Sequence, residues 1–314
     1  GAMILAPIWY DPCRDRLCRF ETALDQMEAE TRAYRADRLG HVATGMRLWK
    51  RAPLQAFFGQ EQRLRFRDPP EAAARLAARG GQGLLIWAGR EPPDFAPAVP
   101  VLRVEDGILR SRGLGADLVA PLSLVTDDLG IYYDPTRPSR LEALIRAPLP
   151  PGGAARAEAL LAALVAARLS KYNLGGGTDL PQTEARPLLL VPGQVEDDAS
   201  IRLGCDEIRT NLGLLQAARA ANPGALIVYK PHPDVEAGLR PGALSMAALD
   251  GLADYTAPGA DPITLIEGCD AVWTLTSTLG FEALLRGKPV TCLGAPFYAG
   301  WGLTTDLGPV PLRR

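Results

Sequence analysis

The chain has 314 residues, 47% of them apolar and 22% charged, which is ordinary for a globular protein and long enough for two domains. Its formal net charge of −2 excludes the overall basic field that draws in nucleic acid, so any anionic ligand must be held by a local cluster. The five cysteines are scattered and there are only two histidines, which argues against a zinc or His-rich site and for a reducing, cytoplasmic compartment.

Residues 1–40 are charged, space their apolar residues as a helix does, and end at Gly40, so we expect a helical preamble or a linker from a neighbouring module. From residue 41 the pattern changes to short apolar runs, and residues 41–174 are expected to form an N-terminal Rossmann-like domain. Within it the sequence predicts strands at 83–89 and 97–107, a short helix at 141–149 and a long helix at 154–173.

Residues 175–186 are rich in Gly, Pro and Thr and are the expected hinge. Strands and helices then alternate through a second Rossmann-like domain, residues 187–314. Because each strand is continuously apolar, the pattern predicts a parallel sheet covered on both faces, and an α/β fold for the chain. The expected strands are 187–193, 225–233, 271–277 and 288–294, and the expected helices are 200–222, 262–269 and 278–287.

Polar residues directly follow three of these strands, at Gln194–Asp198, Lys230–Pro233 and Thr276–Thr278. In open parallel sheets, ligands bind beyond the carboxyl ends of the strands. We therefore expect the three segments to converge on one crevice.

The segment "TLTSTLGFEALLRGKPV" places hydroxyls where a helix begins. Ser277 and Thr278 satisfy free helix amides, and the same helix end can hold a phosphate. Glu282, one turn further, can accept hydrogen bonds from ribose. A plain capped helix is the alternative, but "EALLRGKPV" resembles the nucleotide-sugar signature of glycosyltransferases with two Rossmann domains (GT-B).

In "VYKPHPDV", Pro231 and Pro233 fix the backbone around Lys230 and His232. A rigid Lys/His pair after a strand suits a phosphate or a sugar carboxylate. The alternative is a strand-end turn with surface charges.

Three adjacent acids, Glu196, Asp197 and Asp198, follow the strand at 187–193. A carboxylate held ionised near an anomeric carbon can act as nucleophile, base or oxocarbenium stabiliser, and composition does not choose among these roles. Clustered carboxylates also suit a divalent cation.

A second acidic pair, Glu105 and Asp106, precedes a loop rich in Gly and Arg at 103–118. Arg110 and Arg112 in this loop can neutralise an acidic sugar, although a surface loop is the favoured interpretation of the pattern alone. Lys171 either reaches the nucleotide or complements a helix C-terminus.

Five stretches together resemble the KpsC-type capsule polysaccharide β-Kdo transferases, LipB relatives included, where Kdo is 3-deoxy-D-manno-oct-2-ulosonic acid. The resemblance extends from about residue 41 to the end. Members of that family carry two transferase modules, and this chain resembles the C-terminal one. The five stretches are "EDGILRSRGLGADLVAPLSLVTDDLGIYYDPTRPS", "LSKYNLG", "VPGQVEDDASI", "VYKPHPDV" and "GFEALLRGKPVTCLGAPFYAGWGLT".

The resemblance implies a GT-B-like fold, with an N-terminal acceptor domain and a C-terminal donor domain facing across a cleft. It implies retaining transfer of Kdo from CMP-β-Kdo, without cofactor or metal, to a Kdo-terminated (lyso)phosphatidylglycerol acceptor of Gram-negative capsules. We expect a β-(2→7) linkage, by analogy with the second module. The implied partners are the N-terminal module and the capsule assembly machinery, at the inner face of the inner membrane, and no nucleic acid.

The family's Gln-x-x-x-Asp and His-Pro motifs fall on Gln194 with Asp198 and on His232 with Pro233. By this match Asp198 is the expected nucleophile, forming a glycosyl-enzyme, and Glu105 the expected general acid/base. The expected substrate-binding residues are Gln194, Lys230, His232, Pro233, Ser277, Thr278, Glu282, Arg110 and Lys171.

Two other functional classes remain open from the sequence. One is a nucleotide-sugar-binding or export-associated module without turnover. The other is a metal-dependent epimerase-like enzyme of similar architecture, which would isomerise the donor without an acceptor.

Overall fold

The computed structural model describes residues 7–115, 117–175, 186–311 and 313. Its contacts divide the chain into two compact units, Gly1–Leu102 and Arg103–Arg314. The predicted domain boundary at 175–186 lies almost wholly outside the described residues, and the division into domains at that point stays a prediction.

The first unit begins with an antiparallel pair, β1 (Trp9–Asp11) and β2 (Arg16–Cys18), and a helix, α2 (Phe20–Asp37), within the predicted helical preamble. Strands β3 (His41–Thr44), β4 (Arg65–Phe66) and β5 (Gly83–Trp87) follow, with β3 parallel to both others. The helical elements between and after these strands are η1 (Leu48–Lys50), α3 (Arg51–Phe58), α4 (Pro70–Gly80) and η2 (Ala88–Arg90).

The strands of the first sheet have the order β4-β3-β5-β6-β7, with β6 at Val101–Asp106 and β7 at Leu124–Asp127. Strand β7 is antiparallel to β6, which the apolar pattern does not predict. An antiparallel edge strand on an otherwise parallel sheet is common in α/β folds.

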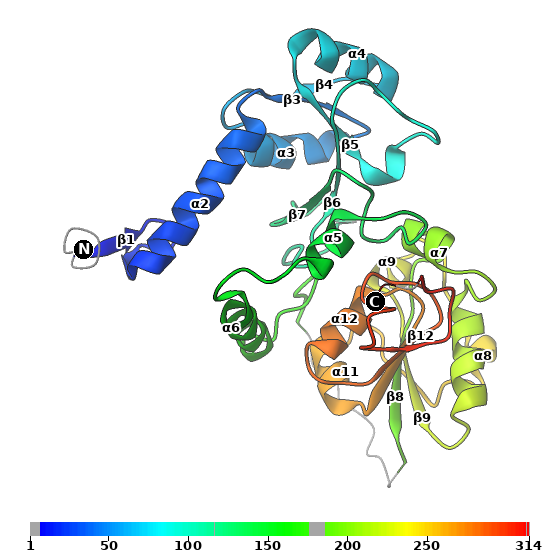
Figure 1. The fold of residues 1–314 in the computed structure, drawn as a ribbon. Helices are drawn as coiled ribbons and strands as arrows, with labels where there is room; N and C mark the ends of the chain where they lie inside the picture. The colour runs from blue at the N-terminus through cyan, green and yellow to red at the C-terminus, as the bar shows by residue number, and fades with distance from the viewer. Residues whose placement is uncertain (1–6, 116, 176–185, 312, 314) are drawn as a thin grey trace. The chain divides into compact units, whose positions relative to one another are not determined.

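The second unit contains a six-stranded sheet of order β10-β9-β8-β11-β12-β13, with every neighbouring pair parallel (Figure 1). The four strands predicted after residue 186 are present as β8, β9, β11 and β12. The strands are β8 (Leu188–Pro192), β9 (Leu226–Lys230), β10 (Tyr255–Thr256), β11 (Ala271–Thr274), β12 (Val290–Cys292) and β13 (Thr305–Asp306).

Helices α11 and α12 cover one face of the six-stranded sheet, and α7 and α8 cover the other (Figure 1). Leu188 and Leu190 face α11 and α12, whereas Leu189 and Val191 face α7 and α8, because side chains alternate along a strand. The helices are α5 (Arg140–Arg146), α6 (Gly153–Ala166), α7 (Ala199–Gly204), α8 (Asn211–Ala221), α9 (Pro233–Glu236), α10 (Met246–Leu249), α11 (Pro262–Gly268) and α12 (Thr278–Leu284).

Two predicted helices differ most from the expectation. The helix predicted at 200–222 is broken into α7 and α8, because the Thr210 side chain accepts from the Gly213 N–H and starts a new helix. The helix predicted at 154–173 ends at Ala166, and Ser170 and Asn173 instead exchange side-chain to backbone hydrogen bonds of 3.0 Å. This break frees residues 170–174 to form the wall of a pocket.

The strand order fixes where a ligand can bind. From β8 the chain passes to β9 on one side, and from β11 it passes to β12 on the other side. Loops that leave two neighbouring parallel strands in opposite directions open a crevice at the carboxyl edge of the sheet. The loops after β8 and β11 carry Gln194–Asp198 and Thr276–Thr278, as expected from the sequence.

Candidate functional site

Gln194 joins the carboxyl ends of β8 and β11. Its Nε2 donates to Thr276 Oγ1 at 3.0 Å, and its Oε1 accepts from the Thr276 backbone N–H at 2.9 Å. Its own backbone N–H donates to Asn211 Oδ1 at 2.8 Å. The side chain is buried and bonds to Thr276 through both its nitrogen and its oxygen, so Gln194 holds the crevice together.

Asp198 lies at the end of the same loop and caps α7. Its Oδ1 accepts from the Ser200 backbone N–H at 2.9 Å and from Ser200 Oγ at 2.7 Å. The side chain is exposed, and within the described residues Oδ2 accepts no hydrogen bond. The contacts to Oδ1 therefore fix the carboxylate and leave Oδ2 available, which suits a nucleophile.

A pocket in the second unit gathers seven of the eleven residues predicted for the site. They reach it from the loops after β9 and β11, from α12, and from the segment that follows α6. The seven are Lys171, Lys230, His232, Pro233, Ser277, Thr278 and Glu282. The other lining residues are Ser170, Tyr172, Leu174, Pro192, Gly193, Pro231, Glu236, Gly259, Ala260, Pro262 and Leu279.

His232 is an uncharged hydrogen-bond donor in this pocket, not the cation that a charged Lys/His pair would supply. Burial, reinforced by Lys171 and Lys230, lowers its pKa to about 4. Its Nδ1 accepts from the Asp234 backbone N–H at 3.1 Å, so in the neutral ring the proton is on Nε2. His232 can therefore offer one N–H to an anion.

Lys230 is buried, and this burial lowers its pKa, against the opposing charges of Glu236 and Asp261. Its Nζ donates to the Pro231 carbonyl at 3.2 Å. A desolvated ammonium with a carbonyl partner keeps strong affinity for an incoming phosphate or carboxylate.

Lys171 and Glu282 connect the segment after α6 to α12. The Lys171 backbone N–H donates to Glu282 Oε1 at 2.7 Å. Burial raises the pKa of Glu282 to about 7. Burial alone would lower the pKa of Lys171, but Tyr172, Tyr132 and Asp198 reverse the effect and raise it.

Ser277 and Thr278 stand at the start of α12. Ser277 Oγ accepts from the Leu279 N–H at 3.2 Å, so the predicted cap is present. The Ser277 carbonyl accepts from the Tyr298 hydroxyl at 2.6 Å, and a Cβ on Gly280 would lie 2.2 Å from that hydroxyl. The close approach explains why glycine occupies position 280 and fixes the loop that carries both hydroxyls.

The charges of Glu105 and Asp198, the two predicted carboxylates, act on the same pair of tyrosines. Burial is the main cause that raises the pKa of Tyr132 and of Tyr133, and the charges of Glu105 and Asp198 raise both further. Such an effect requires proximity. Sequence reasoning did not single out these tyrosines, although a Tyr-Tyr pair in a short loop after a strand is a signal that could have found them.

Arg110 is a structural anchor of its loop. Its guanidinium is buried and contacts Asp106 Oδ2 at 2.9 Å, Ser111 Oγ at 2.7 Å and the Val119 carbonyl at 2.9 Å. These contacts occupy the guanidinium inside the loop, and direct binding of an acidic sugar by Arg110 stays a prediction.

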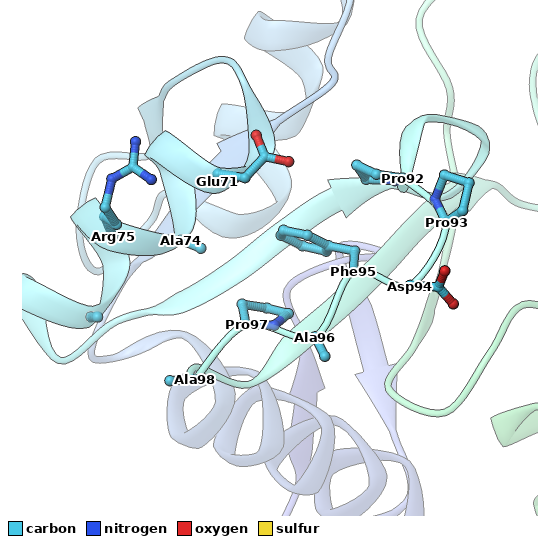
Figure 2. A pocket seen from close by; sticks show the side chains of 11 residues that line it. Glu71, Ala74, Arg75, Pro92, Pro93, Asp94, Phe95, Ala96, Pro97 and Ala98 are labelled. Carbon is cyan, nitrogen blue, oxygen red and sulfur yellow. The ribbon is translucent and has the colours of Figure 1, made fainter.

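A second hollow lies in the first unit, between α4 and residues 92–98. Figure 2 shows Phe95 directed toward α4, with Pro92, Pro93 and Pro97 around it and Glu71 on the helix. It contains none of the predicted site residues.

Within the described residues there is no cluster of three or more His, Cys, Asp or Glu side chains that could hold a metal ion. In the same part of the chain, none of the helices combines the length and the apolar character needed to cross a bilayer.

Comparison with known proteins identifies relatives of this chain. A family model described as capsule polysaccharide biosynthesis protein matches residues 95–176 and 165–313. The capsule polysaccharide modification protein LipA of Neisseria meningitidis serogroup B (strain ATCC BAA-335 / MC58) is 46% identical over 275 residues, which are 86% of this chain and 39% of LipA. The lipopolysaccharide-processing protein LpsZ of Rhizobium meliloti is 46% identical over 222 residues, 69% of this chain and 50% of LpsZ. The chain thus spans half or less of the length of these relatives.

Two solved structures of Thermosulfurimonas dismutans KpsC have a similar fold. One, described as a β Kdo 2,7 transferase, matches with a TM-score of 0.68 and 36% identity over 87% of this chain and 85% of that chain. The other, described as a β Kdo 2,4 transferase, has a TM-score of 0.68 and 33% identity over 84% of this chain and 83% of that chain. The predicted fold class, α/β and GT-B-like with parallel-strand sheets, is confirmed by these matches.

Proposed function

The chain belongs to the family of capsule polysaccharide biosynthesis proteins, and from this premise we propose that it is a retaining β-Kdo transferase. It moves Kdo from CMP-β-Kdo to a Kdo-terminated, lipid-linked acceptor and so extends the poly-β-Kdo linker of a Gram-negative capsule. The similarity to two solved Kdo transferases supports a glycosyltransferase activity.

The pocket at the carboxyl edge of the six-stranded sheet is the observation that carries this proposal. Lys230 and the Nε2–H of His232 supply donors for one phosphate or one sugar carboxylate, and Ser277 and Thr278 add hydroxyls. Glu282 supplies a carboxylate for ribose hydroxyls. This set suits a nucleoside monophosphate sugar, whose single phosphate leaves with help from basic donors.

Transfer begins at Asp198 in this proposal. Its Oδ2 attacks C2 of Kdo, a C2–O bond to the enzyme forms, and the C2–O bond to the phosphate breaks as CMP leaves. The hydrogen bonds from Ser200 to Oδ1 hold the carboxylate in one orientation. The electron-withdrawing carboxylate at C1 disfavours a free oxocarbenium ion, which favours covalent capture.

The second displacement completes the reaction. Glu105 takes the proton from the acceptor hydroxyl, whose oxygen bonds to C2 as the bond to Asp198 breaks. Two inversions give net retention, which requires a pair of carboxylates. The assignment of these two roles follows from the resemblance of the "EDG" and Gln-x-x-x-Asp motifs to those of the family.

The proposal also includes the linkage that is formed and the module to which the chain corresponds. The similar solved structures include both a 2,7 and a 2,4 transferase. We favour β-(2→7) linkage and a C-terminal module, because "VPGQVEDDASI" and "FYAGWGLT" resemble that module. Action beside an N-terminal module and the capsule machinery, at the cytoplasmic face of the inner membrane, follows from such a role.

The test is incubation of the protein with CMP-Kdo and a synthetic Kdo-terminated acceptor. A transferase releases CMP in proportion to the extended acceptor. Donor that is bound but never consumed would identify a binding module instead, and isomerised donor without transfer would identify an epimerase-like enzyme.

A further inference from the structure

The strand order of the first sheet also reverses at its carboxyl edge, between β3 and β5. From β3 the chain passes to β4 on one side, and from β5 it passes to β6 on the other side. The loops after β3 and β5 therefore leave in opposite directions, and the space between them is the expected ligand position of this sheet. No residue of these loops has a role in the function proposed above.

The loops at this edge are tied together. Asp68, which follows β4, accepts from Thr44 Oγ1 at 2.9 Å and from the Gly45 backbone N–H at 2.8 Å. Gly45 has φ +73°, and a Cβ there would lie 2.8 Å from Arg90 Cβ. The loop after β3 therefore lies directly against the loop after β5, and only glycine permits the approach.

Aromatic and basic side chains concentrate at this junction. Lys50 Nζ lies 3.5 Å from the ring centre of Trp87 and 5.2 Å from that of Trp49. Such cation–π contacts orient the indole rings of Trp49, after β3, and Trp87, at the end of β5. Arg47 and Arg90 add exposed guanidinium groups from the two loops.

Two donors at this edge have no partner within the described residues. They are Trp49 Nε1 and Arg51 Nε, both buried atoms. Arg51 lies with its guanidinium carbon 5.0 Å from the Phe66 ring centre and contacts Asp68 at 3.6 Å. Buried donors without acceptors cost free energy unless a ligand or water satisfies them.

We propose that this surface, Arg47, Trp49, Trp87 and Arg90, binds the terminal acidic sugar of the acceptor. Indole rings pack against the apolar face of a sugar, and guanidinium groups pair with its carboxylate. The assignment rests on the proposed function, and it makes Arg90 and Trp87 the residues that select a carboxylate-bearing acceptor over a neutral one.

The side chains at the edge of the first sheet suit an acidic sugar better than a nucleotide. A nucleotide needs a carboxylate for ribose and hydroxyls for phosphate, and both are present in the pocket of the second unit. The edge of the first sheet offers guanidinium groups and indoles instead, which suits an anionic carbohydrate.

The experiment compares wild type with Arg90→Gln, Trp87→Ala and a control, Arg79→Gln. Arg79 is exposed in the last turn of α4, in the same unit, and its change removes the same charge. Binding of a Kdo disaccharide is measured without donor by saturation-transfer NMR and calorimetry. Acceptor KM, donor KM and the slow hydrolysis of CMP-Kdo without acceptor are measured in parallel, and thermal melting confirms folding.

We expect Arg90→Gln and Trp87→Ala each to weaken disaccharide binding and raise acceptor KM about tenfold, a size typical of losing one charged or stacking contact. Donor KM and donor hydrolysis should not change, and Arg79→Gln should match wild type. An acceptor whose terminal carboxylate is reduced to an alcohol should bind wild type and Arg90→Gln equally weakly.

Disaccharide binding that is unchanged in both folded variants overturns the inference, whether or not the protein transfers Kdo. Conversely, wild-type protein that binds the disaccharide through Arg90 and Trp87 but never consumes CMP-Kdo supports the inference and refutes the proposed activity. Absence of disaccharide binding to wild type refutes the acceptor assignment directly.

Discussion

The backbone N–H of Lys171 donates a 2.7 Å hydrogen bond to Glu282, a carboxylate that is 5% exposed. This bond joins the segment after α6 to the helix that lines the pocket. Because the carboxylate is buried, its protonation state links the stability of the unit to pH.

Glu282→Gln should remove this pH dependence. Burial raises the pKa of Glu282 from 4.5 in the unfolded chain to about 7. Because the folded-state pKa is raised, the contribution of Glu282 to the free energy of unfolding is fully present below pH 4.5 and is lost as the pH rises through 7. The size of the pKa shift corresponds to a loss of about 3 kcal/mol. Urea unfolding at pH 5.5 and pH 8 measures the difference.

In the Glu282→Gln variant, the amide oxygen keeps the hydrogen bond from Lys171. We therefore expect the variant to be more stable than wild type at pH 8 and to have a smaller pH slope. Equal slopes for the two proteins would show that Glu282 titrates normally.

His232→Asn should reduce acid destabilisation. The pKa of His232 falls from 6.5 to about 4 through burial and the nearby Lys171 and Lys230. A depressed folded-state pKa means that stability is intact above pH 6.5 and is lost as the pH falls towards 4, by at most about 3 kcal/mol. Thermal melts from pH 7 to pH 4.5 measure the loss.

The His232→Asn substitution preserves local structure, since Asn also caps a helix start and can accept from the Asp234 N–H. A variant as acid-sensitive as wild type would contradict a buried neutral histidine. Donor KM should rise in the variant, because the Nε2–H is lost.

Asp198→Asn should abolish transfer while keeping the fold. Asn retains the cap on α7 that Asp198 makes with Ser200. We expect a fall in kcat of about a thousandfold or more, as for the loss of a covalent nucleophile. CMP binding by calorimetry should stay within a few fold of wild type.

The matched control for this variant is Asp197→Asn, the neighbouring acid, which is exposed and pairs with Arg240 at 2.7 Å. Surface pairs of this kind contribute little, about 1 kcal/mol or less. Comparable losses of kcat in both variants would point to the charge of the cluster and not to Asp198.

Gln194→Leu should lower the free energy of unfolding. The side chain makes two strong hydrogen bonds to Thr276, and its loss leaves the Thr276 N–H buried without a partner, at a cost of about 1–3 kcal/mol. Urea unfolding measures this cost. Gln216→Leu, at an exposed position on α8, is the control and should change stability by about 0.5 kcal/mol or less.

Most strands of the second unit can be predicted from the sequence, because their apolar runs are clear. Leu188–Pro192 is continuously apolar and β9 is apolar up to Tyr229, and polar residues of the crevice follow each apolar run. Strand order then brings Lys230, His232 and Ser277 to one pocket, as expected. Local pattern is sufficient here since the sheet is parallel and buried on both faces.

The remaining features depend on contacts between distant segments, which a local pattern does not contain. Burial sets the direction of the pKa shifts of His232 and Glu282, and Lys171, in a segment that the sequence predicted to be helical, acts to lower both pKa values. The sequence predicts Arg110 to be a ligand-binding cation, but its guanidinium donates hydrogen bonds to Asp106 and to the Val119 carbonyl. The edge strand β7 has only four residues, two apolar and two polar, and its pairing with the distant β6 defines it.

The central claim is that Kdo is transferred with retention of configuration. NMR of the acceptor recovered after reaction with CMP-Kdo reports the anomeric configuration and the linkage together. We predict one added Kdo in β configuration, attached to O7 of the terminal Kdo. An α-linked product, or an acceptor returned unchanged while CMP-Kdo stays intact, would contradict the account.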